Sequence, residues 1–286
     1  MIFVDFSQVM ISNVHMHMSR NQTVEEGMMR HMILNSLRMA KKTYGKKYGE
    51  LVICCDDRQY WRRDVFPYYK AHRKEEREKS DINWGEVFEV LNKVRDEIKE
   101  FFPYKVIQVE KAEADDIIGV LTKHFGAVIN NSTTEQNLIL SSDKDFGQLQ
   151  KFTNVDQYSP ITKKWLRIES PYEFLKEHII RGDRGDGVPN FLSEDSAIIS
   201  KSRQAPIMSK KLEVWLDQKP EEFCDADMMR NYKRNEQLVD LEMVPEKISS
   251  AIINQFENYK VPERRGLLNY FIKNRLKNLM DVISEF

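Results

Sequence analysis

The sequence contains few cysteines and no long apolar stretch. Cys54 and Cys55 are adjacent in a short apolar run, and Cys224 stands alone. This pattern predicts reduced thiols that serve packing, and it argues against a disulfide-stabilised secreted domain. No segment approaches the length of a membrane span, and the N-terminus lacks the charged start and long apolar region of a secretory signal. We therefore expect a cytoplasmic protein that does not contact a membrane.

Histidine and net positive charge are also scarce. Of the six histidines, His15 and His17 form an HxH pair in a polar, methionine-rich segment, and the others are scattered. This distribution argues against a zinc site. The 44 basic and 45 acidic residues give a net charge of −1, which is unexpected for a protein that binds nucleic acid. With 41% hydrophobic residues, the chain is long enough for one sizeable core and a smaller appended unit.

One pair of carboxylates directly follows an apolar run. Leu138 to Leu140 have the character of a strand buried on both faces, and Asp143 and Asp145 follow after two serines. Ligands of open α/β sheets bind beyond the carboxyl ends of the strands, so this pair is a candidate metal site. Taken alone, such a pair is more often a solvated turn that caps a helix.

Four other segments place carboxylates in similar settings. Two acids end or follow apolar runs, three lie in the first turn of a segment with helical periodicity, and two stand three residues apart after an amphipathic stretch. The helix dipole explains acids at one helix N-terminus, but it does not explain all five places together. The complete set of candidate metal ligands is Asp5, Asp56, Glu113, Asp115, Asp116, Asp143, Asp145, Asp183 and Asp186.

Nine carboxylates in one crevice would repel one another and could not remain ionised without cations. Oxygen ligands in such number favour Mg²⁺, with Mn²⁺ as a substitute, and two ions about 4 Å apart form a clamp suited to phosphodiester hydrolysis. When these nine negative charges are set aside, the net charge of the remaining chain rises from −1 to +8. A basic body around an acidic crevice suits a polyanionic substrate.

The segment from Arg58 to Lys79 mixes basic and aromatic residues. It carries eight lysines and arginines against four acidic residues, and five aromatic residues lie among them. Aromatic rings stack on unpaired bases and cations neutralise phosphates, so the mixture is typical of a single-strand channel. The alternative is an exposed charged helix with a few anchoring aromatic side chains.

Strand-like and helix-like segments alternate along the first part of the chain. This order predicts an α/β fold with a largely parallel sheet covered by helices on both faces. Beyond about Ser170 the pattern is mostly helical. The expected strands are Ile2–Phe6, Leu51–Cys55, Tyr104–Val109 and Leu138–Leu140, with edge strands at Val155–Tyr158 and Trp165–Ile168, and the expected long helices are Val24–Tyr44 and Trp84–Phe102.

The acidic motifs, in their order, resemble those of the flap endonuclease or 5′-nuclease superfamily. They read DFSQ at Asp5, CCDD at Asp56, EADD at Glu113, SSDKDF at Asp143 and GDRGD at Asp183. The segments ILNSLR, YWRRD, YYK, KKW and ISEF are similar to those of the phage ribonuclease H branch. The resemblance implies a nuclease core over residues 1–170, with a helical arch at about 57–83, and a helical C-terminal region over 171–286.

The resemblance also implies roles for basic residues. Lys70 and Arg73 match positions that approach the scissile phosphate, and Tyr69 matches a stacking position. The chain departs from the family after Gly187, where it lacks the Gly-x-Gly of the usual DNA-binding helical hairpin, so potassium binding there is not expected from the motif. The candidate nucleic-acid-binding residues are Arg62, Arg63, Tyr69, Lys70, Arg73, Lys74, Ser209 and Lys210.

The expected function is that of a monomeric, metal-dependent 5′ to 3′ exonuclease and flap endonuclease. The resemblance implies action on RNA/DNA and DNA/DNA duplexes with 5′ ends or flaps, and removal of RNA primers during phage DNA replication in the host cytoplasm. A phage single-stranded-DNA-binding protein is an expected partner. Two alternatives remain open, namely a PIN-type single-strand ribonuclease and a non-cleaving binder of DNA junctions.

Overall fold

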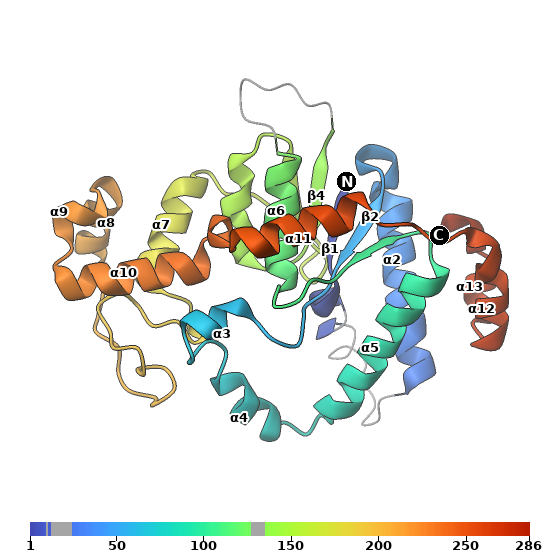
Figure 1. Cartoon of the computed structure of the whole chain (residues 1–286), viewed down its shortest axis with the longest axis horizontal. Helices are drawn as coiled ribbons and strands as arrows, with labels where there is room; N and C mark the ends of the chain where they lie inside the picture. Colours follow the sequence, from blue (N-terminus) through green and yellow to red (C-terminus); the bar gives the residue numbers. More distant parts are fainter. Residues whose placement is uncertain (10, 13–24, 127–134) are drawn as a thin grey trace.

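The computed structural model describes residues 1–9, 11, 12, 25–126 and 135–286. The His15 and His17 pair lies outside the described residues, as do the first residue of the helix expected from Val24 and part of the loop before Gln136. Among the described residues, no helix is both long and apolar enough to span a membrane. Figure 1 shows a central sheet between helices, with one group of helices at each end of the molecule.

Six strands form one sheet in the order β3-β2-β1-β4-β5-β6. Strands β1 to β5 are parallel, and β6 pairs antiparallel with β5 at the edge. Their bounds are β1 (Ile2–Asp5), β2 (Leu51–Cys54), β3 (Lys105–Ile107), β4 (Asn137–Leu140), β5 (Val155–Ser159) and β6 (Lys164–Leu166). The predicted fold class is therefore confirmed, and the carboxyl ends of the adjacent strands β2, β1 and β4 meet at one edge of the sheet.

Alternate residues of each strand pack on opposite faces of the sheet. Ile2 and Val4 belong to one apolar core, whereas Phe3 belongs to the core on the other face. Because both faces are covered, the central strands β1, β2 and β4 contain continuous apolar runs with no polar alternation. The covering helices are α2 (Glu26–Tyr48) and α5 (Trp84–Phe101) on the first face, and α6 (Ala114–His124) and α11 (Glu246–Glu257) on the second.

Helix α5 illustrates how the sequence sets an element. The Asn83 side chain accepts a hydrogen bond from the Glu86 amide at 3.3 Å and caps the first turn. The helix ends at Phe101, two residues before Pro103, which cannot continue it. Its buried residues recur at intervals of three and four and form one face, namely Val87, Leu91, Val94 and Ile98.

The remaining elements extend from this core. Helix α4 lies away from the sheet, between α3 and α5, within the segment expected to form an arch (Figure 1). The helices are α3 (Trp61–Val65), α4 (His72–Glu78), α7 (Pro171–Arg181), α8 (Ser209–Asp217), α9 (Pro220–Phe223), α10 (Ala226–Val239), α12 (Leu267–Lys273) and α13 (Lys277–Met280). The 3-10 helices are η1 (Lys144–Lys151), η2 (Arg184–Asp186), η3 (Leu241–Met243), η4 (Arg264–Gly266) and η5 (Ile283–Glu285).

The C-terminal region contributes to more than one core. Helices α7, α8 and α10 enclose a small core around Phe191 and Tyr232. Helix α11 instead covers the sheet, and α12 and α13 join the core on the opposite face. The last residue, Phe286, is 5% exposed and its ring packs 5.5 Å from Phe102 and 5.3 Å from Phe271. The chain end therefore closes part of the main core.

Candidate active site

Three candidate acids lie where neighbouring parallel strands end. Asp5 is the last residue of β1, and Asp56 and Asp143 follow β2 and β4. The two oxygens of Asp5 accept hydrogen bonds from the Gln8 amide at 3.0 Å and from the Ser141 hydroxyl at 3.2 Å. These bonds fix the carboxylate across β1 and β4, so the order β2-β1-β4 brings acids from three sequence segments to one edge.

The N-terminus of α6 adds further carboxylates to this edge. Asp56 accepts a hydrogen bond from the Ala114 amide in the first turn of α6 at 2.8 Å. The Glu113 amide donates to Asp116 at 2.9 Å, which closes that turn. Asp115, between them in sequence, lines the cavity described below. Asp56, which follows β2, thus holds the N-terminus of α6 against the end of that strand.

Two short 3-10 turns position the other acids. In η1, Asp143 accepts a hydrogen bond from the Asp145 amide at 2.9 Å. In η2, Asp183 accepts one from the Asp186 amide at 3.1 Å. Gly187, which follows η2, has a φ of +78°, and a Cβ there would lie 2.9 Å from the Tyr68 carbonyl oxygen. Glycine therefore lets the backbone after η2 approach the arch segment closely.

Seven of the nine candidate acids line one cavity of about 370 Å³. They come from five separate segments of the chain, as the sequence predicts, and the basic residues Lys70, Arg73 and Lys144 line the same cavity. The seven acids are Asp5, Asp56, Asp115, Asp143, Asp145, Asp183 and Asp186. The arrangement concentrates carboxylate oxygens, which are the ligands that hard divalent cations prefer.

Glu113 and Asp116 differ from the expectation, because neither lines this cavity. They are 1% and 0% exposed and form ion pairs with Arg62 at 2.9 and 2.7 Å. Asp116 also accepts a hydrogen bond from the indole of Trp61 at 3.0 Å. These two acids hold α3 against α6, which is a structural task that sequence spacing does not distinguish from metal binding.

Burial and mutual repulsion perturb the acids of the cavity. Burial raises the pKa of Asp5 to about 7, and the charge of Asp56 adds to this rise. Burial also raises the pKa of Asp145 to about 7, although His178 opposes it. The pKa of Asp115 is raised by burial and then by the charge of Asp143. Cations bound among these groups would stabilise their ionised forms, so the donor set fits divalent metal ions.

Lys70 enters the cavity in an unusual backbone conformation. Its φ is +53°, a region that costs a non-glycine residue free energy, and its amide donates to the Asp186 carbonyl oxygen at 2.7 Å. Its ammonium group lies 2.5 Å from Glu113 and 3.4 Å from Asp186. Arg73 also pairs with Asp186, at 2.5 Å. Both residues with expected catalytic roles therefore contact the acidic cluster.

Two other candidate nucleic-acid-binding residues, Arg62 and Tyr69, are buried, although contact with nucleic acid requires an exposed side chain. Arg62 is 2% exposed and satisfied by Glu113 and Asp116, so its guanidinium is withdrawn from solvent. Tyr69 is also 2% exposed, and its hydroxyl lies 3.0 Å from Glu113 and 2.8 Å from Asp186, so its one hydrogen can be donated to either carboxylate. In this structure neither side chain offers a surface on which a base or a phosphate could rest.

The remaining members of that set are exposed. Arg63 and Lys74 lie in α3 and α4 of the arch segment, and Lys74 pairs weakly with Glu78 at 4.0 Å. Ser209 and Lys210 open α8, and Lys210 lines a different cavity from the acidic one. Their exposure leaves them free to meet a large ligand.

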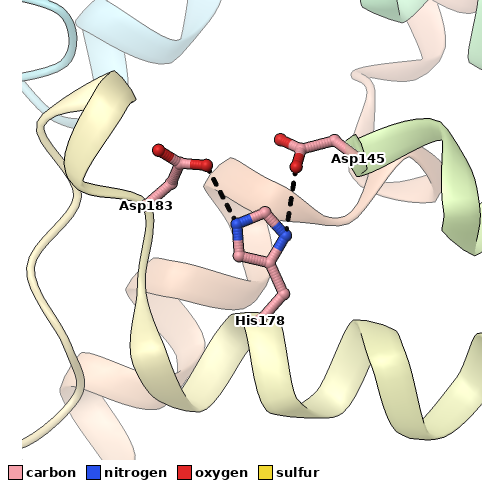
Figure 2. Close-up of side chains that lie close together, drawn as sticks. All are labelled: Asp145, His178 and Asp183. Carbon is pink, nitrogen blue, oxygen red and sulfur yellow. Dashed lines mark hydrogen bonds and ion pairs between the residues drawn. The ribbon is translucent and has the colours of Figure 1, made fainter. Parts of the chain in front are cut away.

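The sequence did not indicate His178 as part of the site. This histidine lies in α7, is 6% exposed, and stands between two of the carboxylates, Asp145 and Asp183 (Figure 2). Burial lowers its pKa, but the hydrogen bond with Asp183 and the charge of Asp145 outweigh this effect, so the net change is upward. The sequence did contain a signal for this residue. His178 is a polar side chain beside the apolar Ile179 and Ile180 of an amphipathic helix, five residues before Asp183.

A second cavity of about 860 Å³ carries basic residues that the sequence also left unassigned. Arg184, Lys201 and Arg203 line it, together with His72 and Glu76 from α4. Gly185 lines both this cavity and the acidic one. The two cavities are therefore neighbours, with η2 between them.

The comparisons with known proteins agree with this architecture. Residues 1–178 match the model of the 5′-3′ exonuclease N-terminal, resolvase-like domain. The chain belongs to the 5′-3′ exonuclease family. Residues 171–286 match the C-terminal domain model of phage T4 ribonuclease H. The chain is 34% identical to the ribonuclease H of Enterobacteria phage T4 over 293 residues, which cover 99% of this chain and 94% of that protein. The resemblance seen in the sequence is thereby confirmed, and the protein is a 5′ nuclease by family.

Solved structures of this family share the fold. The phage T5 D15 protein crystallised with metal ions has a TM-score of 0.60 and 16% identity, and the match covers 90% of this chain and 97% of that one. A phage T5 flap endonuclease in a pseudo-enzyme–product complex with DNA and metal ions has a TM-score of 0.59 and 14% identity, with 90% and 97% coverage. At this identity the likeness concerns the fold.

Proposed function

We propose that this family member hydrolyses phosphodiester bonds at 5′ ends with the help of two divalent cations, Mg²⁺ in the cell. The observation that carries the proposal is the convergence of seven carboxylates from five segments on one cavity of about 370 Å³. Such a cluster is costly to bury unless cations compensate it. The proposed substrates are RNA/DNA and DNA/DNA duplexes with recessed or nicked 5′ ends, and 5′ flaps.

The acids divide into two sets by their place in the fold. Asp5, Asp56, Asp115 and Asp143 come from the strand ends and α6, and would hold one cation. Asp145, Asp183 and Asp186 come from η1 and the turn before and within η2, and would hold the other. Two cations bound there would activate a water for attack and neutralise charge on the leaving oxygen. Glu113 and Asp116 would not bind a cation directly. They would position the site through their ion pairs with Arg62 and, for Glu113, with Lys70.

The proposal gives Lys70 and Arg73 the task of stabilising charge on the reacting phosphate. Both line the acidic cavity and are held by Asp186. When a phosphate enters, it competes with Asp186 and Glu113 for these donors. Preorganised cations of this kind stabilise the negative charge that develops in the transition state. The strained backbone at Lys70 is consistent with such a task.

The second cavity supplies a path for the polyanion. Arg184, Lys201 and Arg203 place positive charge beside the acidic cavity, at the boundary marked by Gly185. A strand whose scissile phosphate lies at the acids could extend along these residues, because phosphates are neutralised by lysine and arginine. Exposed Arg63 and Lys74 of the arch segment would contact the same strand.

Removal of RNA primers during phage DNA replication is the proposed role. The similarity to the ribonuclease H of phage T4 supports an RNA/DNA hybrid as one substrate. The phage T5 flap endonuclease was crystallised in a pseudo-enzyme–product complex with DNA and metal ions, which supports DNA as a second substrate. A phage single-stranded-DNA-binding protein that covers the exposed template is the proposed partner, and the enzyme is proposed to act as a monomer in the host cytoplasm.

Cleavage of labelled substrates tests the proposal. A 5′-flap DNA and a 5′-labelled RNA/DNA duplex should be cut from the 5′ end in Mg²⁺ and remain whole in EDTA. Asp56→Asn should abolish cutting, whereas Asp57→Asn should retain it, because Asp57 does not line the acidic cavity and accepts instead from the Lys111 amide at 2.8 Å. Faster cutting of free single-stranded RNA than of the flap would favour a PIN-type ribonuclease. Binding without cutting in Mg²⁺ would favour a junction binder.

A further inference from the structure

His178 is a buried imidazole between two carboxylates of the acidic cavity. Its Nε2 lies 3.0 Å from an oxygen of Asp183, and its Nδ1 lies 3.4 Å from an oxygen of Asp145 (Figure 2). Among the described residues, neither that Asp145 oxygen nor the Nδ1 atom has a hydrogen-bond partner, and their contact is an ion pair when the ring is protonated. The ring is therefore directed at these two acids and at no other polar group.

The two carboxylates belong to different segments, which are also joined by an ion pair between Lys144 of η1 and Asp183 at 3.6 Å. Asp145 lies in η1, directly after β4, whereas Asp183 follows α7. The Asp183 carboxylate accepts a hydrogen bond from the Asp186 amide within its own turn, whereas the Asp145 amide donates to the neighbouring Asp143 carboxylate. Lys144 is 65% exposed and reaches only Asp183, whereas the buried imidazole contacts both acids, so the ring can set their separation.

The ring stands behind the acids and away from the cavity itself. Asp145 and Asp183 line the acidic cavity, and His178 is not among its lining residues. Although one potential ligand atom from each of the three residues lies within 4.8 Å of the others, each ring nitrogen already faces a carboxylate oxygen. A group that contacts metal ligands from outside the cavity orients those ligands.

We propose that His178 is a positioning residue that holds Asp145 and Asp183 at the spacing required to bind one of the two divalent cations. This inference rests on the proposed function. Outer partners of this kind change metal affinity by roughly 10–100-fold when removed, because the ligands lose their orientation. The effect should fall on the cation held by Asp145, Asp183 and Asp186, and leave the affinity for the other cation nearly unchanged.

Titration of the metal-free, full-length protein with Mn²⁺, followed by the electron paramagnetic resonance signal of free Mn²⁺, tests this inference. Wild type should bind two ions per chain. His178→Ala should weaken one of them by about 10–100-fold, and His178→Gln should recover part of the loss, because a glutamine amide can donate to Asp183. His124→Ala is the control, since His124 is an exposed histidine 3.7 Å from Glu257 and does not line the acidic cavity.

The possible outcomes distinguish a failure of the proposed two-metal function from a failure of the inference about His178. Fewer than two Mn²⁺ ions on wild type would contradict the two-metal function, and the inference would fall with it. Two ions on wild type with unchanged affinities in His178→Ala would overturn the inference alone. A nitrogen coupling to bound Mn²⁺ that His178→Gln removes would also overturn it, because His178 would then be a ligand. Thermal unfolding of each variant in EDTA verifies that the protein compared is folded.

Discussion

Replacement of Arg62 by methionine should destabilise the fold although the residue lies in a basic segment. The guanidinium is 2% exposed and donates to Glu113 at 2.9 Å, to Asp116 at 2.7 Å and to the Leu238 carbonyl oxygen at 2.8 Å. In the variant, the fully buried Asp116 would keep only the Trp61 indole and a backbone amide as donors. Loss of one partner of a buried ion pair costs about 3–5 kcal/mol, and methionine fills part of the volume, so we expect a loss of about 3 kcal/mol at pH 7.

Urea unfolding followed by tryptophan fluorescence measures this loss. Arg63→Met is the matched control, because Arg63 is exposed, donates to the Tyr69 carbonyl oxygen at 3.2 Å and lies 5.2 Å from the centre of the Tyr60 ring. A surface change of this kind should alter the free energy of unfolding by less than about 0.5 kcal/mol, while it weakens the binding of 5′-flap DNA. Equal free energies of unfolding for the two variants would refute the assignment of Arg62 to the buried network.

Three further outcomes are expected. Asp5 and Asp145 have folded-state pKa values of about 7, above the unfolded value of about 3.9, so the folded state retains protons that the unfolded state has released. The thermal midpoint of EDTA-treated protein should therefore fall as pH rises from about 4 to about 7, and Mg²⁺ should reverse the fall; a midpoint that does not change over this range would contradict the burial of these acids. Lys70→Ala should slow single-turnover cleavage by roughly 10²–10³-fold at saturating Mg²⁺, and near wild-type rates would remove its role in transition-state stabilisation. Phe286→Ala should lower the free energy of unfolding by about 3 kcal/mol, whereas Ile161→Ala, at a side chain 57% exposed, should leave it nearly unchanged, and equal effects would show that the chain end does not close the core.

The sheet and the meeting of the acids could be predicted because both follow from local patterns. Continuous apolar runs such as Leu51–Cys54 indicate strands buried on both faces, and parallel strands place their carboxyl ends at one edge. An acid that directly follows such a strand therefore lies at that edge, whatever the position of the strand in the sheet. This reasoning places Asp5, Asp56 and Asp143 correctly without knowledge of which strands are neighbours.

Other features depended on contacts that have no local signature. Arg62 and Arg63 are adjacent in sequence and alike in chemistry, yet one is buried and the other exposed. The difference arises because α3 packs on α6, a contact between segments about 50 residues apart. The pairing of His178 with Asp145 likewise joins α7 to η1. Sequence periodicity identifies a buried face, but it does not identify the partner buried against it.

The EADD motif shows how one acidic segment serves two purposes. Successive residues of a helix point about 100° apart, so Glu113 and Asp116, three residues apart, share a face while Asp115 points elsewhere. The shared face meets Arg62, and Asp115 lines the acidic cavity. Glu113 also pairs with Lys70, whose side chain lines the acidic cavity. The buried network therefore connects Arg62, at the start of the arch segment, to Lys70. Asp115, a proposed metal ligand, and the two acids that pair with Arg62 thus lie on one turn, so the same element positions the arch segment and the acidic cavity.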